Sequence, residues 1–111
     1  MPLMFLQTSL KDSDIPAGFE RQLCEKIGEV LNKPMERITL TMVTGARQMR
    51  AGSSDPMAML TIHSIGVFDK DKNPTYTPPL MEFMTEKLKL PPARVLFHYV
   101  DLEGYMVGQQ T

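Results

Sequence analysis

Apolar and polar positions along the chain predict four β-strands and two helices. In two segments, apolar residues recur at every third or fourth position, which is the spacing of an amphipathic helix. Four shorter runs are rich in β-branched and other apolar residues, as strands are. The predicted elements are, in order, a strand over 3–8, a helix from Ile15 to its stop at Asn32, strands over 38–43 and 57–65, a charged turn over 69–75, a helix with Thr77 as its N-cap that ends before Pro91, a strand over 94–101, and at most a brief edge strand in 102–111.

The order of these elements contains an internal repeat. A shift of 57 residues places Pro34 on Pro91 and Arg37 on Arg94, and it also superimposes the apolar stripes of the two helices. Apolar residues match easily by coincidence, but proline and arginine matching together favour a duplication. We therefore expect a single domain, 1–111, made of two β-α-β units at about 2–56 and 59–111, each with a right-handed crossover and parallel strands.

Two such units joined edge to edge predict an α+β fold with a four-stranded mixed sheet and both helices on one face. The second face of the sheet is then expected to be too apolar to stay in water, because one helical layer cannot cover every apolar strand residue. A closed homo-oligomer is the simplest partner for such a face. The residues behind this expectation are Phe5, Leu40, Met42, Leu60, Ile62, Phe97 and Tyr99.

Composition and charge narrow the classes of partner. A net charge of −1 gives no electrostatic basis for binding nucleic acid or an anionic membrane. The start of the sequence lacks the basic region of a signal peptide, and no apolar run approaches the length that spans a bilayer. Cys24 cannot form an intramolecular disulfide, and together with His63 and His98 it gives no metal-binding pattern, so we expect no metal site.

The first two residues offer a candidate for catalysis. Proline at position 2 is small enough to permit removal of Met1, which would leave the secondary amine of Pro2 as the chain terminus. An α-amino group has a pKa of about 7.7–8.0, and burial in apolar surroundings lowers that pKa. A buried terminal amine is therefore unprotonated at neutral pH and can act as a general base. The alternative is that Met1-Pro2 carries no chemistry, as in many cytosolic proteins.

Several motifs in the order seen here resemble the family of macrophage migration inhibitory factor and D-dopachrome tautomerase. The resemblance covers essentially the whole chain, and several details are closer to the D-dopachrome branch. The shared motifs are Met1-Pro2, Asn32-Lys33-Pro34, the stretch 52–56 and Ser64-Ile65-Gly66, and those closer to the D-dopachrome branch include Pro16-Ala17-Gly18, Leu23-Cys24 and Glu82-Phe83.

The resemblance implies a homotrimer in which three sheets form a barrel with the helices outside. It implies keto–enol tautomerisation of small carboxylated substrates of the phenylpyruvate or D-dopachrome type, without a cofactor. Secreted relatives also act as cytokines through a cell-surface receptor and leave the cell without a signal peptide. The expected location is therefore the cytoplasm, with secretion by a non-classical route.

The resemblance also assigns roles to individual residues. Pro2 corresponds to the catalytic base, and Lys33 to the lysine that pairs with the substrate carboxylate, although a helix-end cation is its ordinary alternative. Ser64 and Ile65 correspond to the strand end whose backbone lines the pocket. Arg37 is expected to be a second anion contact; its alternative is to support a turn, as expected of Arg94. His98 is expected to donate a hydrogen bond to the pocket of a neighbouring chain; its alternative is an ordinary interface histidine.

The sequence departs from the inhibitory-factor branch around the expected pocket. Leu96 and His98 replace an aromatic residue and an asparagine, and Gln109 replaces a C-terminal aromatic residue, for which Tyr105 is a partial substitute. These changes predict a more open and less aromatic rim, with the chain stopping at Thr111. Three functions stay open: a tautomerase, a cytokine-like ligand with a vestigial pocket, and a relative of bacterial isomerases acting on another unsaturated acid.

Overall fold

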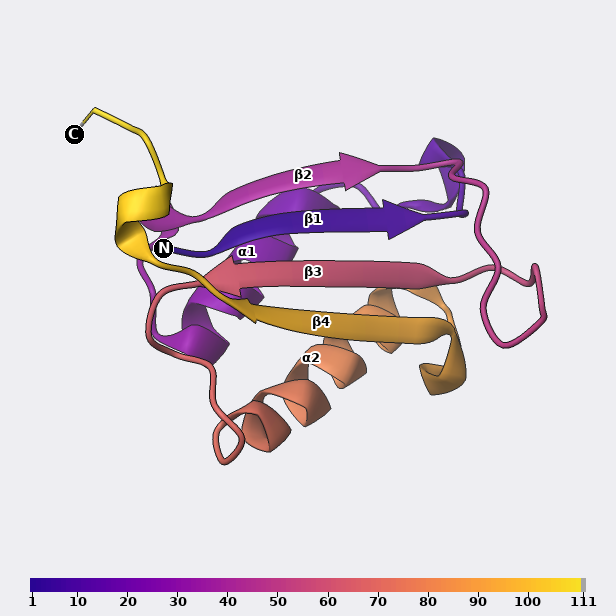
Figure 1. Cartoon of the computed structure of the whole chain (residues 1–111). Helices are drawn as coiled ribbons and strands as arrows, with labels where there is room; N and C mark the ends of the chain where they lie inside the picture. Colours follow the sequence, from indigo (N-terminus) through magenta and orange to yellow (C-terminus); the bar gives the residue numbers. More distant parts are fainter. Residues whose placement is uncertain (111) are drawn as a thin grey trace.

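The computed structural model describes residues 1–110 and contains one four-stranded sheet with two helices on one of its faces (Figure 1). The strand order is β2-β1-β3-β4; β1 pairs in parallel with β2, β3 pairs in parallel with β4, and β1 and β3 are antiparallel. The predicted α+β class is confirmed. The elements are β1 (Leu3–Thr8), α1 (Phe19–Leu31), β2 (Thr39–Val43), β3 (Ala58–Ser64), α2 (Asn73–Leu88) and β4 (Val95–Asp101), with short 3₁₀ turns η1 (Asp12–Asp14), η2 (Met35–Arg37), η3 (Pro92–Arg94) and η4 (Gly104–Met106).

The two halves of the chain have the same local plan. In each half a helix ends at a residue in the left-handed conformation, Asn32 with φ 55° and Lys89 with φ 57°. A 3₁₀ turn follows in each half, and η2 and η3 lie 57 residues apart, as do Asn32 and Lys89. Duplication of an ancestral unit would produce such matching turns, and it stays a prediction.

The hydrophobic core lies between the helices and one face of the sheet. Alternate residues of each strand point to the same face, so Met4 and Leu6 of β1 lie beside Leu60 and Ile62 of β3, all fully buried. Each such side chain stabilises the fold by about 1.5–3 kcal/mol relative to exposure. The helices contribute the opposing layer, with Phe19, Leu23, Ile27, Leu31, Leu80, Met84 and Leu88.

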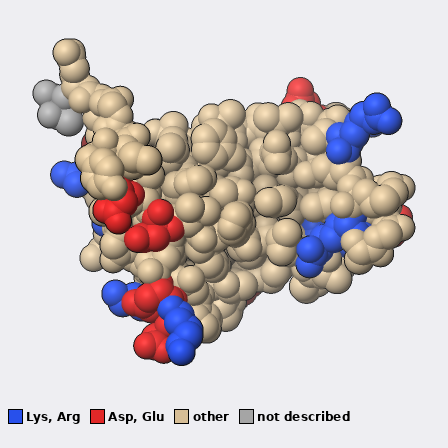
Figure 2. Space-filling view, in the orientation of Figure 1, with Lys and Arg blue, Asp and Glu red and all other residues tan. Residues whose placement is uncertain are grey.

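The expected composition of the second sheet face was wrong in detail. Six of the seven residues assigned to that face lie on the same side of the sheet as Met4 and face the helices. Only Phe5 lies on the other side, which no helix covers and which we call the open face. The open face carries no Lys, Arg, Asp or Glu, and Figure 2 shows charged side chains gathered toward the two ends of the visible surface. Its residues are Leu3, Phe5, Gln7, Thr39, Thr41, Val43, Met59, Thr61, His63, Leu96, His98 and Val100.

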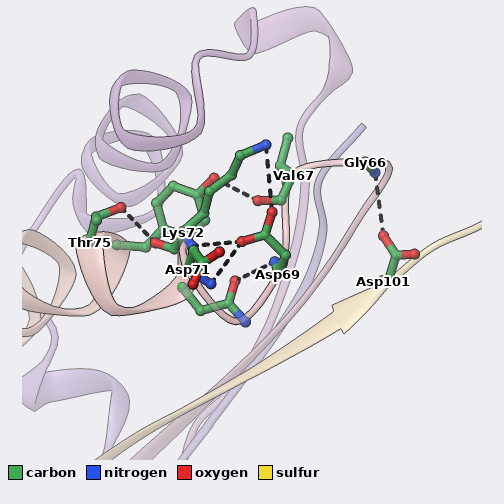
Figure 3. A network of polar contacts seen from close by, with 9 residues as sticks. Gly66, Val67, Asp69, Asp71, Lys72, Thr75 and Asp101 are labelled. Atoms are coloured by element: carbon green, nitrogen blue, oxygen red, sulfur yellow. Dashed lines mark hydrogen bonds and ion pairs between the residues drawn. The ribbon is translucent and has the colours of Figure 1, made fainter.

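Helix α2 begins one turn earlier than predicted, at Asn73, and the expected turn over 69–75 is partly helical. The start is held by Asp69, whose Oδ1 accepts the backbone N–H groups of Asp71 (2.9 Å) and Lys72 (2.7 Å), as Figure 3 shows. Pro78 and Pro79 therefore lie inside the helix, where each removes a backbone donor. Instead of acting as an N-cap, Thr77 hydrogen-bonds through its hydroxyl to that of Tyr99 at 2.6 Å.

The C-terminal segment differs from the prediction as well. Residues 102–110 contain η4 and no strand, so the brief edge strand considered from the sequence is absent there. The part of that expectation that falls on Thr111 lies outside the described residues. None of the helices in residues 1–110 is long and apolar enough to cross a bilayer.

Candidate functional site

A cavity of about 410 Å³ lies at the end of the sheet where β1 begins and β3 and β4 finish. Its walls come from segments that are far apart in the sequence: the N-terminus, η2, the residue after β3 and the C-terminal segment. Figure 1 shows the N-terminus beside η4 at this end of the molecule. The lining residues are Met1, Glu36, Arg37, Ile65, Gly104, Val107 and Gln109.

Pro2 lies directly behind Met1 at this cavity. Its side chain is buried, and its carbonyl oxygen accepts the backbone N–H of Thr39 at 3.0 Å, which fixes the start of β1 against β2. Pro2 is not itself part of the lining, whereas its neighbour Met1 is.

The chain terminus at this position favours a neutral amine. Burial lowers the pKa of the Met1 amine below 8.0, and the positive charges of Lys33 and Arg37 lower that pKa further. Both positive charges act on the terminal amine, but of these two side chains only Arg37 is among the residues that line the cavity. A negatively charged ligand in the cavity would therefore meet Arg37 beside a group able to accept a proton.

Lys33 owes its position to the tight turn at the end of α1. Its backbone N–H donates to the carbonyl of Gly28 at 2.9 Å, across the left-handed Asn32. A Cβ atom at Gly28 would lie only 2.7 Å from the Lys33 carbonyl oxygen, so a larger residue would displace the turn. Sequence reasoning missed this role of Gly28, although a glycine in the interior of a predicted helix is a recognisable signal.

Arg37 and its repeat counterpart Arg94 have opposite surroundings. Arg37 is exposed and lines the cavity, and its side chain makes no hydrogen bond or ion pair within residues 1–110. The Arg94 guanidinium donates to four backbone carbonyls of the loop before β3, those of Arg50, Ser53, Asp55 and Pro56. Arg94 therefore supports a turn, as expected, whereas Arg37 is free to meet an anion.

The remaining predicted residues are divided between the cavity and its surroundings. Ile65 lines the cavity and is 39 % exposed. The Ser64 side chain is fully buried outside the lining, and its carbonyl accepts the Leu102 N–H at 2.9 Å. His98 is exposed on the open face opposite Thr61, and it does not reach the cavity of its own chain.

The C-terminal segment forms a wall that sequence reasoning could describe only in part. Gly104, Val107 and Gln109 lie on the cavity, whereas Tyr105 lies outside the lining and is 83 % exposed. Tyr105 therefore does not take the place of the missing C-terminal aromatic residue. None of the cavity-lining residues is aromatic, and Glu36 adds a carboxylate at the wall that had not been anticipated.

Other, larger cavities have fewer features of a catalytic site. One of about 580 Å³ includes Lys89 and Arg94, but its arginine is already occupied by the four carbonyls. Another, of about 480 Å³, lies at the start of α1 near Asp12 and Glu20. Within residues 1–110, no group of three or more His, Cys, Asp and Glu side chains is arranged to hold a metal ion.

Comparison with known proteins relates this architecture to one family. The profile of the macrophage migration inhibitory factor family matches residues 1–111. The mouse (Mus musculus) protein named D-dopachrome decarboxylase is 34 % identical over 111 residues, covering 99 % of this chain and 94 % of the relative. Macrophage migration inhibitory factor of Meriones unguiculatus is 30 % identical over 108 residues, with coverages of 97 % and 94 %. The solved structure of that factor from Trichinella spiralis superimposes with a TM-score of 0.91 at 29 % identity, covering 96 % of this chain and 95 % of the other.

Proposed function

Because the chain belongs to the macrophage migration inhibitory factor family, we propose that it is a cofactor-free tautomerase with Pro2 as its general base. The relatives named D-dopachrome decarboxylase are more similar to it, at up to 34 % identity, than the inhibitory factor of Meriones unguiculatus at 30 %. Those names indicate enzymes that remove a carboxyl group from D-dopachrome, a substrate that therefore bears a carboxylate. A cavity lined by Arg37, at a terminal amine on which the charge of Lys33 also acts, suits such a substrate.

The proposed mechanism begins with removal of Met1, which leaves the Pro2 nitrogen as the terminal amine. That nitrogen takes the proton from the carbon next to the substrate carbonyl, and the electron pair of the broken C–H bond forms the enol double bond. The carbonyl π electrons move to the oxygen, and the same nitrogen returns the proton to that oxygen, which gives the enol and the free amine; the reverse order of the two transfers gives the keto form. Lys33 and Arg37 bind the substrate carboxylate and also keep the pKa of the amine low, so that it is neutral when substrate arrives.

We propose that three chains assemble through the open faces of their sheets. The open face carries no Lys, Arg, Asp or Glu, so burying it in an interface would not leave one of these charges buried without a partner. His98 projects from this face, where it could donate a hydrogen bond to the cavity of a neighbouring chain. Ile65, at the strand end, would contact the substrate next to Pro2.

The observation that carries the proposal is a chain terminus at a cavity that Arg37 also lines, with the pKa of the terminal amine lowered by burial and by the charges of Lys33 and Arg37. Its test is an enol–keto tautomerase assay with phenylpyruvate on the wild type, on Pro2→Gly, and on a variant with alanine inserted between Met1 and Pro2. The insertion should abolish turnover while circular dichroism and sedimentation stay unchanged. Mass spectrometry of each protein must show which residue is the terminus, and full activity of the insertion variant would remove the Pro2 amine from the mechanism.

A cytokine-like role is the second candidate, favoured by a cavity lining without aromatic residues and by the name of the relative macrophage migration inhibitory factor. In that case the protein would act outside the cell after non-classical secretion from the cytoplasm, and turnover would be incidental. A macrophage migration assay with wild type and with the insertion variant separates the two. Inhibition of migration by a catalytically dead but folded variant would favour the cytokine-like role.

A further inference from the structure

One buried hydroxyl in the core has no hydrogen-bond partner. Ser64 is 0 % exposed, and its Oγ makes no hydrogen bond within residues 1–110. Thr8, the other buried polar residue, is fully satisfied, because its hydroxyl donates to the Met57 carbonyl at 2.7 Å and accepts the Leu10 N–H at 3.1 Å. Buried polar groups without partners are uncommon and call for an explanation.

The orphan hydroxyl lies at the strand position opposite Pro2. In the antiparallel pairing of β1 with β3, Leu3 stands opposite His63, so the next pair outward is Pro2 with Ser64. Directly opposed residues have Cβ atoms about 5 Å apart. Pro2 and Ser64 also share the helix-facing side of the sheet with Met4 and Ile62, and both are buried.

The cavity lies directly beyond this pair. Its lining includes Met1 and Ile65, which are the neighbours of Pro2 and Ser64 on the outer side. While Met1 is in place, the Pro2 nitrogen is an amide without a hydrogen, and it can neither donate nor accept. Removal of Met1 turns that nitrogen into an amine with one N–H and one lone pair, which is a partner that Ser64 lacks at present.

We propose that the Ser64 hydroxyl oxygen accepts a hydrogen bond from the N–H of the processed Pro2 and so directs the nitrogen lone pair into the cavity. This inference rests on the proposed function, in which Pro2 is the base. Ser64 is then a positioning residue that never touches the substrate. A neutral pyrrolidine nitrogen inverts freely, and without an acceptor behind it the lone pair would point into the cavity only part of the time.

The charges around the pair act separately from this hydrogen bond. Lys33 follows α1, Glu36 and Arg37 come from η2, and Asp101 stands opposite Ser64 at the end of β4, where its Oδ1 accepts the Gly66 N–H at 3.4 Å (Figure 3). Lys33 and Arg37 disfavour the protonated amine, and Glu36 and Asp101 favour it. An acceptor oxygen stabilises the ammonium form, so its loss should make Pro2 less basic while these four charges stay unchanged.

The test compares Ser64→Thr with Ser64→Val, because the two side chains have nearly the same shape and differ only in the hydroxyl. Reaction of the Pro2 amine with a small electrophile, followed by mass spectrometry as a function of pH, reports its basicity without any turnover. The midpoint for Ser64→Val should lie roughly one pH unit below that for Ser64→Thr. With phenylpyruvate, kcat should fall about tenfold in Ser64→Val while KM stays within about twofold.

Equal labelling midpoints for the two processed variants would overturn the inference. If the midpoints differ and neither protein turns over substrate, the proposed function fails while the hydrogen bond stands. A Thr8→Val variant is the control, since it removes a hydroxyl that has partners. It should lower the thermal midpoint of unfolding and leave the labelling midpoint of Pro2 at the wild-type value, and a shift like that of Ser64→Val would count against a specific role for Ser64.

Discussion

Replacing Arg94 by alanine should destabilise the fold, whereas the same change at its repeat counterpart Arg37 should not. The Arg94 guanidinium donates to the carbonyls of Asp55 (2.7 Å), Arg50 (3.0 Å), Ser53 (3.2 Å) and Pro56 (3.3 Å). One side chain thus ties the loop before β3 to the turn before β4.

The size of the effect follows from these contacts. A net hydrogen bond contributes about 0.5–1.5 kcal/mol, and one from a charged donor contributes more. Arg94 is partly exposed, and water can reach the carbonyls once it is gone, so the lower value applies to each of the four. The expected loss for Arg94→Ala is therefore about 2 kcal/mol. Arg37 has no side-chain partner within residues 1–110, and Arg37→Ala should stay within about 0.5 kcal/mol of the wild type.

Urea unfolding followed by circular dichroism measures both changes, at one protein concentration because association adds to apparent stability. Arg94→Lys is the matched control, since an ammonium cannot donate to four carbonyls in one plane and should recover less than half of the loss. Arg37→Ala should raise KM for phenylpyruvate at unchanged stability. The reasoning fails if the two alanine variants have the same unfolding midpoint, or if Arg94→Lys is as stable as the wild type.

Three further predictions concern the cavity, helix α2 and the open face. Lys33→Ala should raise KM about tenfold for a carboxylate substrate and much less for its methyl ester, and equal effects on the two would argue against an ion pair. The backbone N–H groups of Lys72 and Asp71 hold the pKa of Asp69 below 3.8, so its stabilising effect is complete above that pH and is lost as the pH falls through the lower folded value. Asp69→Ala should therefore lower Tm at pH 7, and the difference from the wild type should shrink as the pH falls through the lowered pKa of Asp69 in melts followed by circular dichroism; a constant difference at all pH values would contradict this reasoning. Thr61→Asp places a charge on the open face, and sedimentation should then detect monomers, whereas an intact assembly would exclude that face as the interface.

The sequence predicted the elements better than it predicted the direction of their side chains. Strand β4 reads as an almost continuous apolar run, so the face to which each of its side chains points could not be assigned from hydrophobicity alone. The threonines at 39, 41 and 61 mark the open face in the structure, but β-branched residues are equally typical of buried strands. Only the pairing register shows that Leu40 and Met42 share a face with Met4 and Leu6.

The candidate site could be predicted where a local motif carries it. Met1, Arg37 and Ile65 belong to motifs that are visible in the sequence, and they do line one cavity. The contributions of Gly28 and of the Ser64 side chain depend on contacts across the fold, between a helix and the turn after it or between two antiparallel strands. The wall formed by residues 102–110 could not be predicted, because that segment has no helical or strand periodicity and its position depends on contacts with other elements.

The two ends of the sheet are built from equivalent segments, but their two arginines have different surroundings. Each end receives a helix terminus, a prolyl turn and an arginine. At one end, the loop leading into β3 supplies carbonyls that occupy Arg94. At the other end, the Arg37 side chain makes no hydrogen bond or ion pair within residues 1–110, and its charge lowers the pKa of the terminal amine. Under the proposed function, one arginine of the matched pair supports a loop, whereas its counterpart acts on the catalytic amine.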